Sequence, residues 1–169
     1  MDTHEAVWIS GMLESGMGTV VAARIKDGGR KAIVGVFVVD IACLGVKNAM
    51  YESCPVDDYR ERIRGFYEEE FAMEPVEPCC ARRLVVEAIA YAQSLGFPPH
   101  PDTAKAVRAF EGVESKDCTR SFTFGRDGKP FYVQGPHESG LQVKRILQQL
   151  ERRCGPGGYH YLVQVTPDF

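Results

Sequence analysis

Three side chains that could take part in catalysis lie close together near the end of a long apolar run. Asp40, Cys43 and Lys47 offer a carboxylate, a thiol and an amine, which could serve as an acid or base, a nucleophile and an anion contact. In a regular strand Asp40 and Cys43 would point to opposite faces. They converge only if the strand has ended by Ala42. The structural alternative is a capping aspartate, a core cysteine and a surface lysine.

A second candidate is His100-Pro101-Asp102, which follows two further prolines. Each proline fixes its own φ and restricts the residue before it, so this loop should hold the imidazole of His100 firmly. A histidine and an aspartate two residues apart could share a metal, but two ligands are too few for a metal site. The structural alternative is an exposed His100 followed by Asp102 as a helix cap.

The third candidate lies at residues 135–140, between a predicted strand and a predicted helix. Free backbone N–H groups and the helix dipole allow such a junction to hold an anion. His137 and Ser139 lie within it, and Arg126 and Lys129 lie at the tip of the predicted hairpin before it. We therefore predict an anion-binding group of these four residues, with the alternative that the junction binds nothing.

The charge pattern contrasts two helical segments. Residues 56–77 carry eight acids against three bases, which predicts a solvated acidic face or an acidic surface for a basic partner. The last predicted helix has an exposed basic side, but no recognition motif and no strand rich in aromatic residues accompanies it. A solvated face is therefore favoured over a contact with nucleic acid. The basic side chains of this helix are Lys144, Arg145, Arg152 and Arg153.

The six cysteines form no CxxC pair, and the only close pair, Cys79-Cys80, is adjacent. Adjacent cysteines suit neither a mutual disulfide nor the usual spacing of zinc ligands. The simplest interpretation is that all six are buried small apolar residues in a reducing compartment. The sequence predicts no metal site and leaves any cofactor unknown.

Composition places the chain among ordinary globular proteins. With 169 residues, 44% of them apolar and 25% charged, it is long enough for one domain with a substantial core. The net charge of −3 gives no overall signature of a nucleic-acid partner. No apolar run reaches the roughly 18 residues of a membrane span, and the acidic N-terminus is no secretory signal. We therefore expect a cytoplasmic protein without a membrane partner.

The element that must position Asp40 is the apolar run from Lys31 to Lys47. Its β-branched residues show little alternation, which favours a strand covered on both faces, with a buried helix as the alternative. The Asp-Gly turn at residues 26–30 joins it to a strand at Thr19–Ile25, which predicts a hairpin. A buried, ionised Asp40 would have to be paired or hydrogen-bonded.

Elsewhere, hydrophobic spacing predicts helices over Cys79–Leu95 and Ser139–Arg153, an acidic helix starting at Asp57-Asp58, and a short helix near Thr103. A short strand is predicted at Val7–Ile9. A second hairpin should pair Ser121–Phe124 with Phe131–Val133 through another Asp-Gly turn, and Tyr159–Val165 should form a final strand. The expected class is α+β, a single domain over residues 1–169: a mainly antiparallel sheet built from two hairpins plus a C-terminal strand, with three or four packed helices.

These features lead to three hypotheses about function. The first is a non-enzymatic intracellular binding or interaction module, because no complete catalytic set is visible; its partner, a protein or otherwise, is unknown. The second is a small hydrolase with Asp40 as base or metal ligand, His100 as proton shuttle or ligand, Lys47 as anion contact, and Asp102 and Cys43 in the same cleft. The third is weak nucleic-acid binding through the basic C-terminal helix and the tip of the second hairpin.

Overall fold

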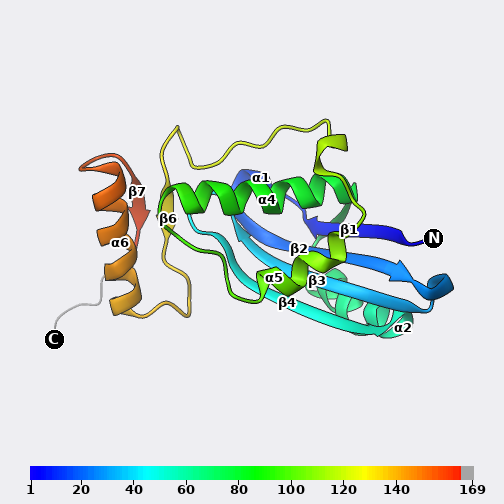
Figure 1. The fold of residues 1–169 in the computed structure, drawn as a ribbon. Helices are drawn as coiled ribbons and strands as arrows, with labels where there is room; N and C mark the ends of the chain where they lie inside the picture. The colour runs from blue at the N-terminus through cyan, green and yellow to red at the C-terminus, as the bar shows by residue number, and fades with distance from the viewer. Residues whose placement is uncertain (165–169) are drawn as a thin grey trace.

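The computed structural model describes residues 1–164 and has an α+β fold, as the sequence predicts (Figure 1). The main sheet is antiparallel, with the order β4-β3-β2-β1-β5. Its first four strands follow one another along the chain, and the fifth returns to pair with the first. The strands are β1 (Thr3–Ile9), β2 (Met17–Lys26), β3 (Lys31–Asp40), β4 (Gly45–Pro55) and β5 (Met73–Val76).

Residues 41–44 of the apolar run form a turn and residues 45–47 begin β4, but its first ten residues, 31–40, are a strand, as its β-branched content predicts. These ten residues form β3, which lies between β2 and β4 and is buried on both faces because each face supports a separate core. Phe37 packs in one core and Val34 in the other. The Asp-Gly hairpin is also confirmed: Asp27 and Gly28 have φ of 53° and 67° in the turn between β2 and β3, the left-handed values that such turns require.

Helices cover both faces of the sheet. The long helix α4 (Pro78–Ser94), followed by α5 (Thr103–Ala106) and a 3₁₀ turn at Val107–Phe110, packs on the face that carries Trp8 and Phe37. A continuous helical segment covers the other face with Tyr59 and Ile63. It consists of α2 (Val56–Asp58), a π-helical stretch at Tyr59–Arg64 and α3 (Gly65–Glu70). Short helical turns complete the main part: α1 (Met12–Ser15) and Ser115–Asp117.

The C-terminal unit, residues 126–164, lies at one end of the main sheet (Figure 1). Its strands β6 (Phe131–Val133) and β7 (His160–Leu162) are parallel, and α6 (Gly140–Cys154) connects them. A third core joins the unit to the main sheet, since Tyr132 and Leu150 pack with Cys43 and Leu44 from the turn after β3. Ser139 caps α6 through a reciprocal capping box with Gln142, which fixes the start of that helix.

The second hairpin departs from the prediction. Only the turn forms, as a single bridge between Arg126 and Lys129, and residues 121–124 are not a strand. The reason lies in the two phenylalanines of that segment. Phe122 packs edge-on against Trp8, and Phe124 stacks on Tyr91 of α4, so the segment lies against the packed core instead of pairing with β6.

Three further strands differ from expectation, and one of them, β5, lies in the acidic segment of residues 56–77, for which only a helix was predicted. Strand β4 was not predicted, because its exposed side carries mixed polar residues that mask the alternation. The final strand is shorter than predicted and pairs with β6 in a separate sheet instead of joining the main one. Val165, the last residue of the predicted strand, lies outside the described residues.

The cysteines are not all simple buried thiols. Cys43 and Cys54 are free and buried, as expected, and Cys79 and Cys154 are half-buried. Cys80 and Cys118 are also buried but form a disulfide, with their Cα atoms 5.0 Å apart. The two residues are 38 positions apart in the chain, so their proximity depends on tertiary packing that local sequence patterns do not reveal.

Within residues 1–164, none of the helices combines the length and the apolar character needed to cross a lipid bilayer.

Candidate functional site

Asp40 is a buried carboxylate that organises the turn after β3. Its side chain is only 2% exposed, and its two oxygens accept hydrogen bonds from the backbone N–H groups of the next turn, at 3.0 to 3.2 Å. Burial raises the pKa of Asp40 to about 6, although these hydrogen bonds oppose the rise. The strand does end before Ala42, but the carboxylate turns inward to the backbone. The donors are Ala42, Cys43 and Leu44.

Cys43 and Lys47 lie in different environments. Cys43 is in the turn after β3, and Lys47 is near the start of β4. Cys43 is fully buried in the third core, and burial raises the pKa of its thiol, with the negative charge of Asp40 adding to the rise. Lys47 instead reaches the C-terminal unit, where its ammonium lies 3.6 Å from the carboxylate of Glu138. A thiol with a raised pKa is a poor nucleophile.

Glu138 contacts β4, β6 and the loop before α6. Besides pairing with Lys47, it accepts hydrogen bonds from the hydroxyl of Tyr132 at 2.7 Å and from the backbone N–H of Gly135 at 2.6 Å. Burial and this hydrogen bond both raise the pKa of Tyr132. Glu138 was not among the predicted site residues, and its position between His137 and Ser139 was the only signal that could have drawn attention to it.

His100 and Asp102 lie on the proline-rich connector after α4. The connector docks on β4, because the backbone N–H of His100 donates to the carbonyl of Val46 at 3.0 Å. The Nδ1 atom of His100 accepts the backbone N–H of Asp102 at 3.1 Å and lies 3.9 Å from its carboxylate. This local geometry orients the imidazole, and Asp102 stands at the start of α5 without capping it through its side chain.

The structure brings two of the five predicted catalytic residues to one cavity. Lys47 and His100 line a hollow of about 330 Å³, together with Glu138 and the apolar residues of the proline-rich connector. Asp40, Cys43 and Asp102 are not among its lining residues. The cavity therefore offers an imidazole and an ion pair.

The predicted anion-binding group is also divided. Arg126 and Lys129 meet at the hairpin tip, but Lys129 donates to the carbonyl of Gly157 at 2.8 Å and so ties the tip to the segment before β7. Ser139 is engaged as the cap of α6, and His137 is exposed on the loop before it. The guanidinium of Arg126 lies over the ring of Phe131, 5.2 Å from its centroid.

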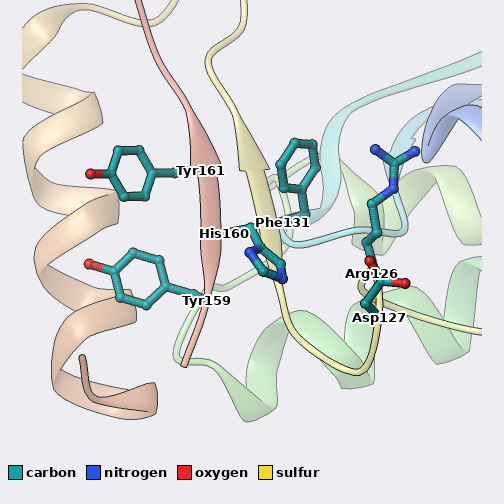
Figure 2. Close-up of a pocket in the computed structure, with 6 residues that line it drawn as sticks. All are labelled: Arg126, Asp127, Phe131, Tyr159, His160 and Tyr161. Atoms are coloured by element: carbon teal, nitrogen blue, oxygen red, sulfur yellow. The ribbon is translucent and has the colours of Figure 1, made fainter. Parts of the chain in front are cut away.

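Around Arg126 the structure has an aromatic surface that was not among the predicted sites. A hollow of about 460 Å³ is lined by residues from the hairpin tip, β6 and β7 (Figure 2). His160 lies 6.2 Å from Phe131, ring to ring, and Tyr159 lies 5.9 Å from Tyr161. Figure 2 shows both tyrosines extending toward α6, while His160 points to the other side of the strand.

This surface continues onto the last helix. Tyr159 lines a second hollow, of about 660 Å³, whose other walls are residues of α6, among them Lys144 and Arg152. Tyr159 is held there by its hydroxyl, which donates to the carboxylate of Glu151 at 2.8 Å. We call the combined area the aromatic–basic surface; it comprises Arg126, Phe131, Tyr159, His160, Tyr161, Lys144 and Arg152.

The sequence did contain a signal for this surface. Tyr159-His160-Tyr161 is a run of three ring-bearing residues in a short predicted strand, and its proximity to the Arg126 hairpin comes from the pairing of β6 with β7. That pairing joins segments about thirty residues apart, which local patterns do not predict.

No protein-family model matches the sequence, and neither the curated proteins nor the solved structures include a match to the chain.

Proposed function

We propose that the protein is a non-enzymatic module that binds single-stranded nucleic acid through its aromatic–basic surface. The observation that carries the proposal is the group of Arg126, Phe131 and His160 beside an open hollow, with the Arg126 guanidinium over the Phe131 ring and the His160 ring tilted against it. Proteins that bind single strands combine a positive groove for the phosphates with aromatic faces for the bases. Both components are adjacent here.

The bases of a single strand are free to stack, whereas those of a duplex are not. Tyr161 is 55% exposed, and its ring extends toward α6, on the side of β7 opposite His160 (Figure 2). The guanidinium of Arg126 is exposed as well, and a guanidinium plane can stack on a base and also contact a phosphate. Both residues line the hollow of about 460 Å³.

The charge of this part of the chain supports the same ligand. Residues 120–164 carry seven lysines and arginines against three acids, although the whole chain has a net charge of −3. The basic residues of α6 are exposed and lie beyond Tyr159, so a strand that stacks at the hollow would pass along their side chains. Opposite charge attracts a polyanion to this end of the molecule and away from the acidic helical segment.

The cavity at Lys47 and His100 gives a hydrolase less support. Its lining includes no serine, threonine or cysteine, and the ammonium of Lys47 is already paired with Glu138. The carboxylate of Asp40, the residue expected to act as base, already accepts hydrogen bonds from three backbone N–H groups. A nucleophile and a base within reach of each other are the minimum for covalent hydrolysis.

The proposal is tested by fluorescence anisotropy with labelled single-stranded RNA and DNA of roughly 12 nucleotides, a length within the range of known single-strand sites. We expect the single-stranded RNA and the single-stranded DNA to bind at low salt, and a duplex of the same sequence to bind more weakly. The affinity should fall steeply with salt, since each phosphate contact releases counterions. Arg126→Ala should weaken binding about tenfold, or about 1.4 kcal/mol.

Lys31→Ala is the matched control, because Lys31 is an exposed base at the far end of β3 from the C-terminal unit. Its removal lowers the net charge by the same amount and should leave the affinity within twofold. Equal losses for the two variants would mean that only overall charge matters. The absence of binding at low salt would overturn the proposal.

A further inference from the structure

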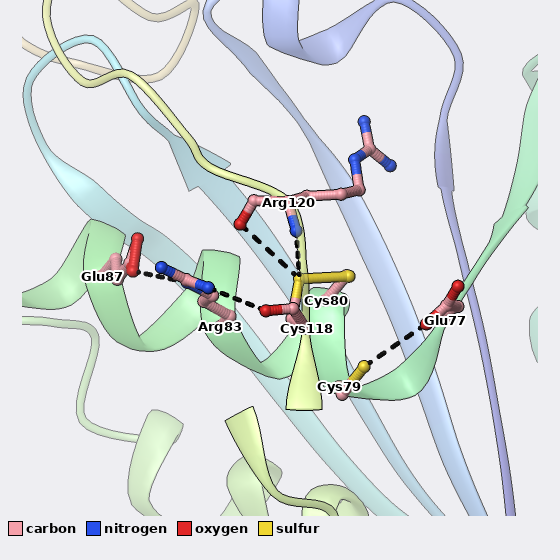
Figure 3. Close-up of a disulfide and its surroundings, with 7 residues drawn as sticks. All are labelled: Glu77, Cys79, Cys80, Arg83, Glu87, Cys118 and Arg120. Carbon is pink, nitrogen blue, oxygen red and sulfur yellow. Dashed lines mark hydrogen bonds and ion pairs between the residues drawn. A yellow bond between two sulfur atoms is a disulfide. The ribbon is translucent and has the colours of Figure 1, made fainter. Parts of the chain in front are cut away.

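Three cysteine sulfurs meet at the start of α4. The Sγ atoms of Cys79, Cys80 and Cys118 all lie within 4.8 Å of one another. Two of them form the disulfide, and Cys79 stands beside it as a free thiol (Figure 3). Cys79 adjoins Cys80 in the chain, and the packing of Cys118 against this pair brings the third sulfur to the group.

A fourth donor lies next to the free thiol. Oε2 of Glu77 is 3.6 Å from Sγ of Cys79, and Figure 3 shows the two side chains directed toward each other. In a tetrahedral zinc site with ordinary bond lengths, two sulfurs lie about 3.8 Å apart and a sulfur and a carboxylate oxygen about 3.5 Å apart. The three sulfurs are therefore near the spacing of three ligands in such a site, and the carboxylate of Glu77, which lies against Cys79 and outside the group of three sulfurs, would turn toward them to supply the fourth ligand.

The surroundings suit bound thiolates. Cys79 and Cys80 lie in the first turn of α4, where the helix dipole favours negative charge. The backbone N–H of Arg120 points at Sγ of Cys118, 3.4 Å away, and Arg83 donates to the carbonyl of Cys118 at 2.9 Å. Such outer contacts orient metal ligands and offset their charge. Glu77 is exposed and Cys79 half-buried, which leaves a route for an ion from solvent.

We propose that, once the disulfide is reduced, Cys79, Cys80, Cys118 and Glu77 bind one zinc ion. A dithiol reductant supplies two electrons and two protons, which open the S–S bond to two thiols while the reductant becomes a disulfide. Zn²⁺ then replaces the three thiol protons, which pass to solvent. In the oxidised chain only Cys79 and Glu77 remain as donors, too few for a stable zinc site. Either the disulfide or the metal thus links the start of α4 to Cys118.

The test uses the full chain, reduced with a phosphine under anaerobic conditions, freed of reductant and titrated with Co²⁺ as a spectroscopic substitute for zinc. We expect one Co²⁺ per chain, a sulfur-to-cobalt charge-transfer band, visible bands of tetrahedral cobalt, and loss of all of them when Zn²⁺ is added. The oxidised chain should show none of these bands. A reduced wild-type chain without a charge-transfer band would overturn the proposal.

Two variants locate the site. Cys79→Ser keeps the disulfide, so its oxidised form can be checked for a native fold by circular dichroism; after reduction it should bind Co²⁺ at least about tenfold more weakly, the scale on which even outer-contact changes act. Cys154→Ser removes a half-buried thiol outside the cluster and should bind as the wild type does. If Cys79→Ser retained full affinity, or Cys154→Ser lost it, the assignment of ligands would be wrong.

Discussion

Asp40 and Arg126 show how differently two charged residues, both singled out in the sequence, are placed in the fold. The carboxylate of Asp40 is buried and surrounded by backbone donors. Arg126 is exposed at a hairpin tip and stacks on an aromatic ring. Residue type suggested chemistry at both places, but only one is open to a ligand.

The difference teaches that hydrogen-bond partners, more than residue type, separate a structural role from a binding role. Each oxygen of Asp40 is already engaged by the turn that it stabilises. Arg126 is exposed, and its guanidinium lies over the Phe131 ring without an acceptor of its own among the hydrogen bonds described above. We therefore expect substitutions at Asp40 to change stability and substitutions around Arg126 to change affinity.

The largest effect should come from Asp40→Ala. At pH 5 we expect the free energy of unfolding to fall by about 3 kcal/mol, because three backbone N–H groups of the turn lose their acceptor. Urea denaturation followed by circular dichroism measures it. Asp57→Ala, which removes an exposed acid, should change stability by no more than about 0.5 kcal/mol. A loss below about 1 kcal/mol for Asp40→Ala would remove the structural role proposed for this carboxylate.

The second effect is that the loss of unfolding free energy caused by Asp40→Ala changes with pH. The pKa of Asp40 is raised by folding, from 3.8 to about 6, so the folded chain binds a proton more tightly than the unfolded chain does. The stability contributed by this proton is fully present below pH 3.8 and is lost as the pH rises through 6. The stability gap between wild type and Asp40→Ala should therefore narrow by about 2 kcal/mol between pH 4 and pH 7. A gap that widens over this range would contradict the direction of the shift.

The third effect concerns the open surface. Tyr161→Ala should weaken binding of single-stranded RNA by about 1 kcal/mol, roughly fivefold, because a base loses its stacking partner. The free energy of unfolding should stay within about 0.5 kcal/mol, since the ring is mostly exposed. Phe66→Ala is the control, because it removes another exposed ring, which lies on α3 in the main part of the molecule. Anisotropy titrations that rank the two variants equally would show that Tyr161 has no part in binding.

The smallest effect should be that of Lys47→Met. The ion pair with Glu138 is partly buried at both ends, but Glu138 keeps its hydrogen bonds from Tyr132 and Gly135. We expect a loss of about 1 kcal/mol or less in urea denaturation. A loss above about 3 kcal/mol would indicate that Glu138 depends on Lys47 as its main partner, and the cavity beside His100 would then merit attention as a site.

Local patterns predicted the elements that depend on neighbouring residues. The Asp-Gly sequence sets the turn at Asp27 and Gly28, and the apolar stripes of α4 and α6 locate both helices to within one or two residues of their ends. These signals succeed because their physical cause lies within a few residues of the chain.

What could not be predicted depends on contacts between distant segments. The parallel pairing of β6 with β7, the bond between Cys80 and Cys118, and the approach of His100 to β4 each join parts of the chain far apart in sequence. The aromatic–basic surface arises from the first of these. The run Tyr159-His160-Tyr161 is visible in the sequence, but its proximity to Phe131 exists only because the two short strands are adjacent.

The turn after β3 has one more consequence, for how the chain can be shortened. The backbone N–H of Gly125 donates to the carbonyl of Ile41 in this turn, and the N–H of Phe131 donates to the carbonyl of Ala42. The side chains of Cys43 and Leu44 pack against the C-terminal unit. A fragment that stops at residue 124 would leave those two carbonyls without their donors and would expose an apolar patch to water. Such a patch promotes self-association. Expression trials that aim at the main sheet alone should therefore either keep the C-terminal unit or replace Leu44 with a polar residue.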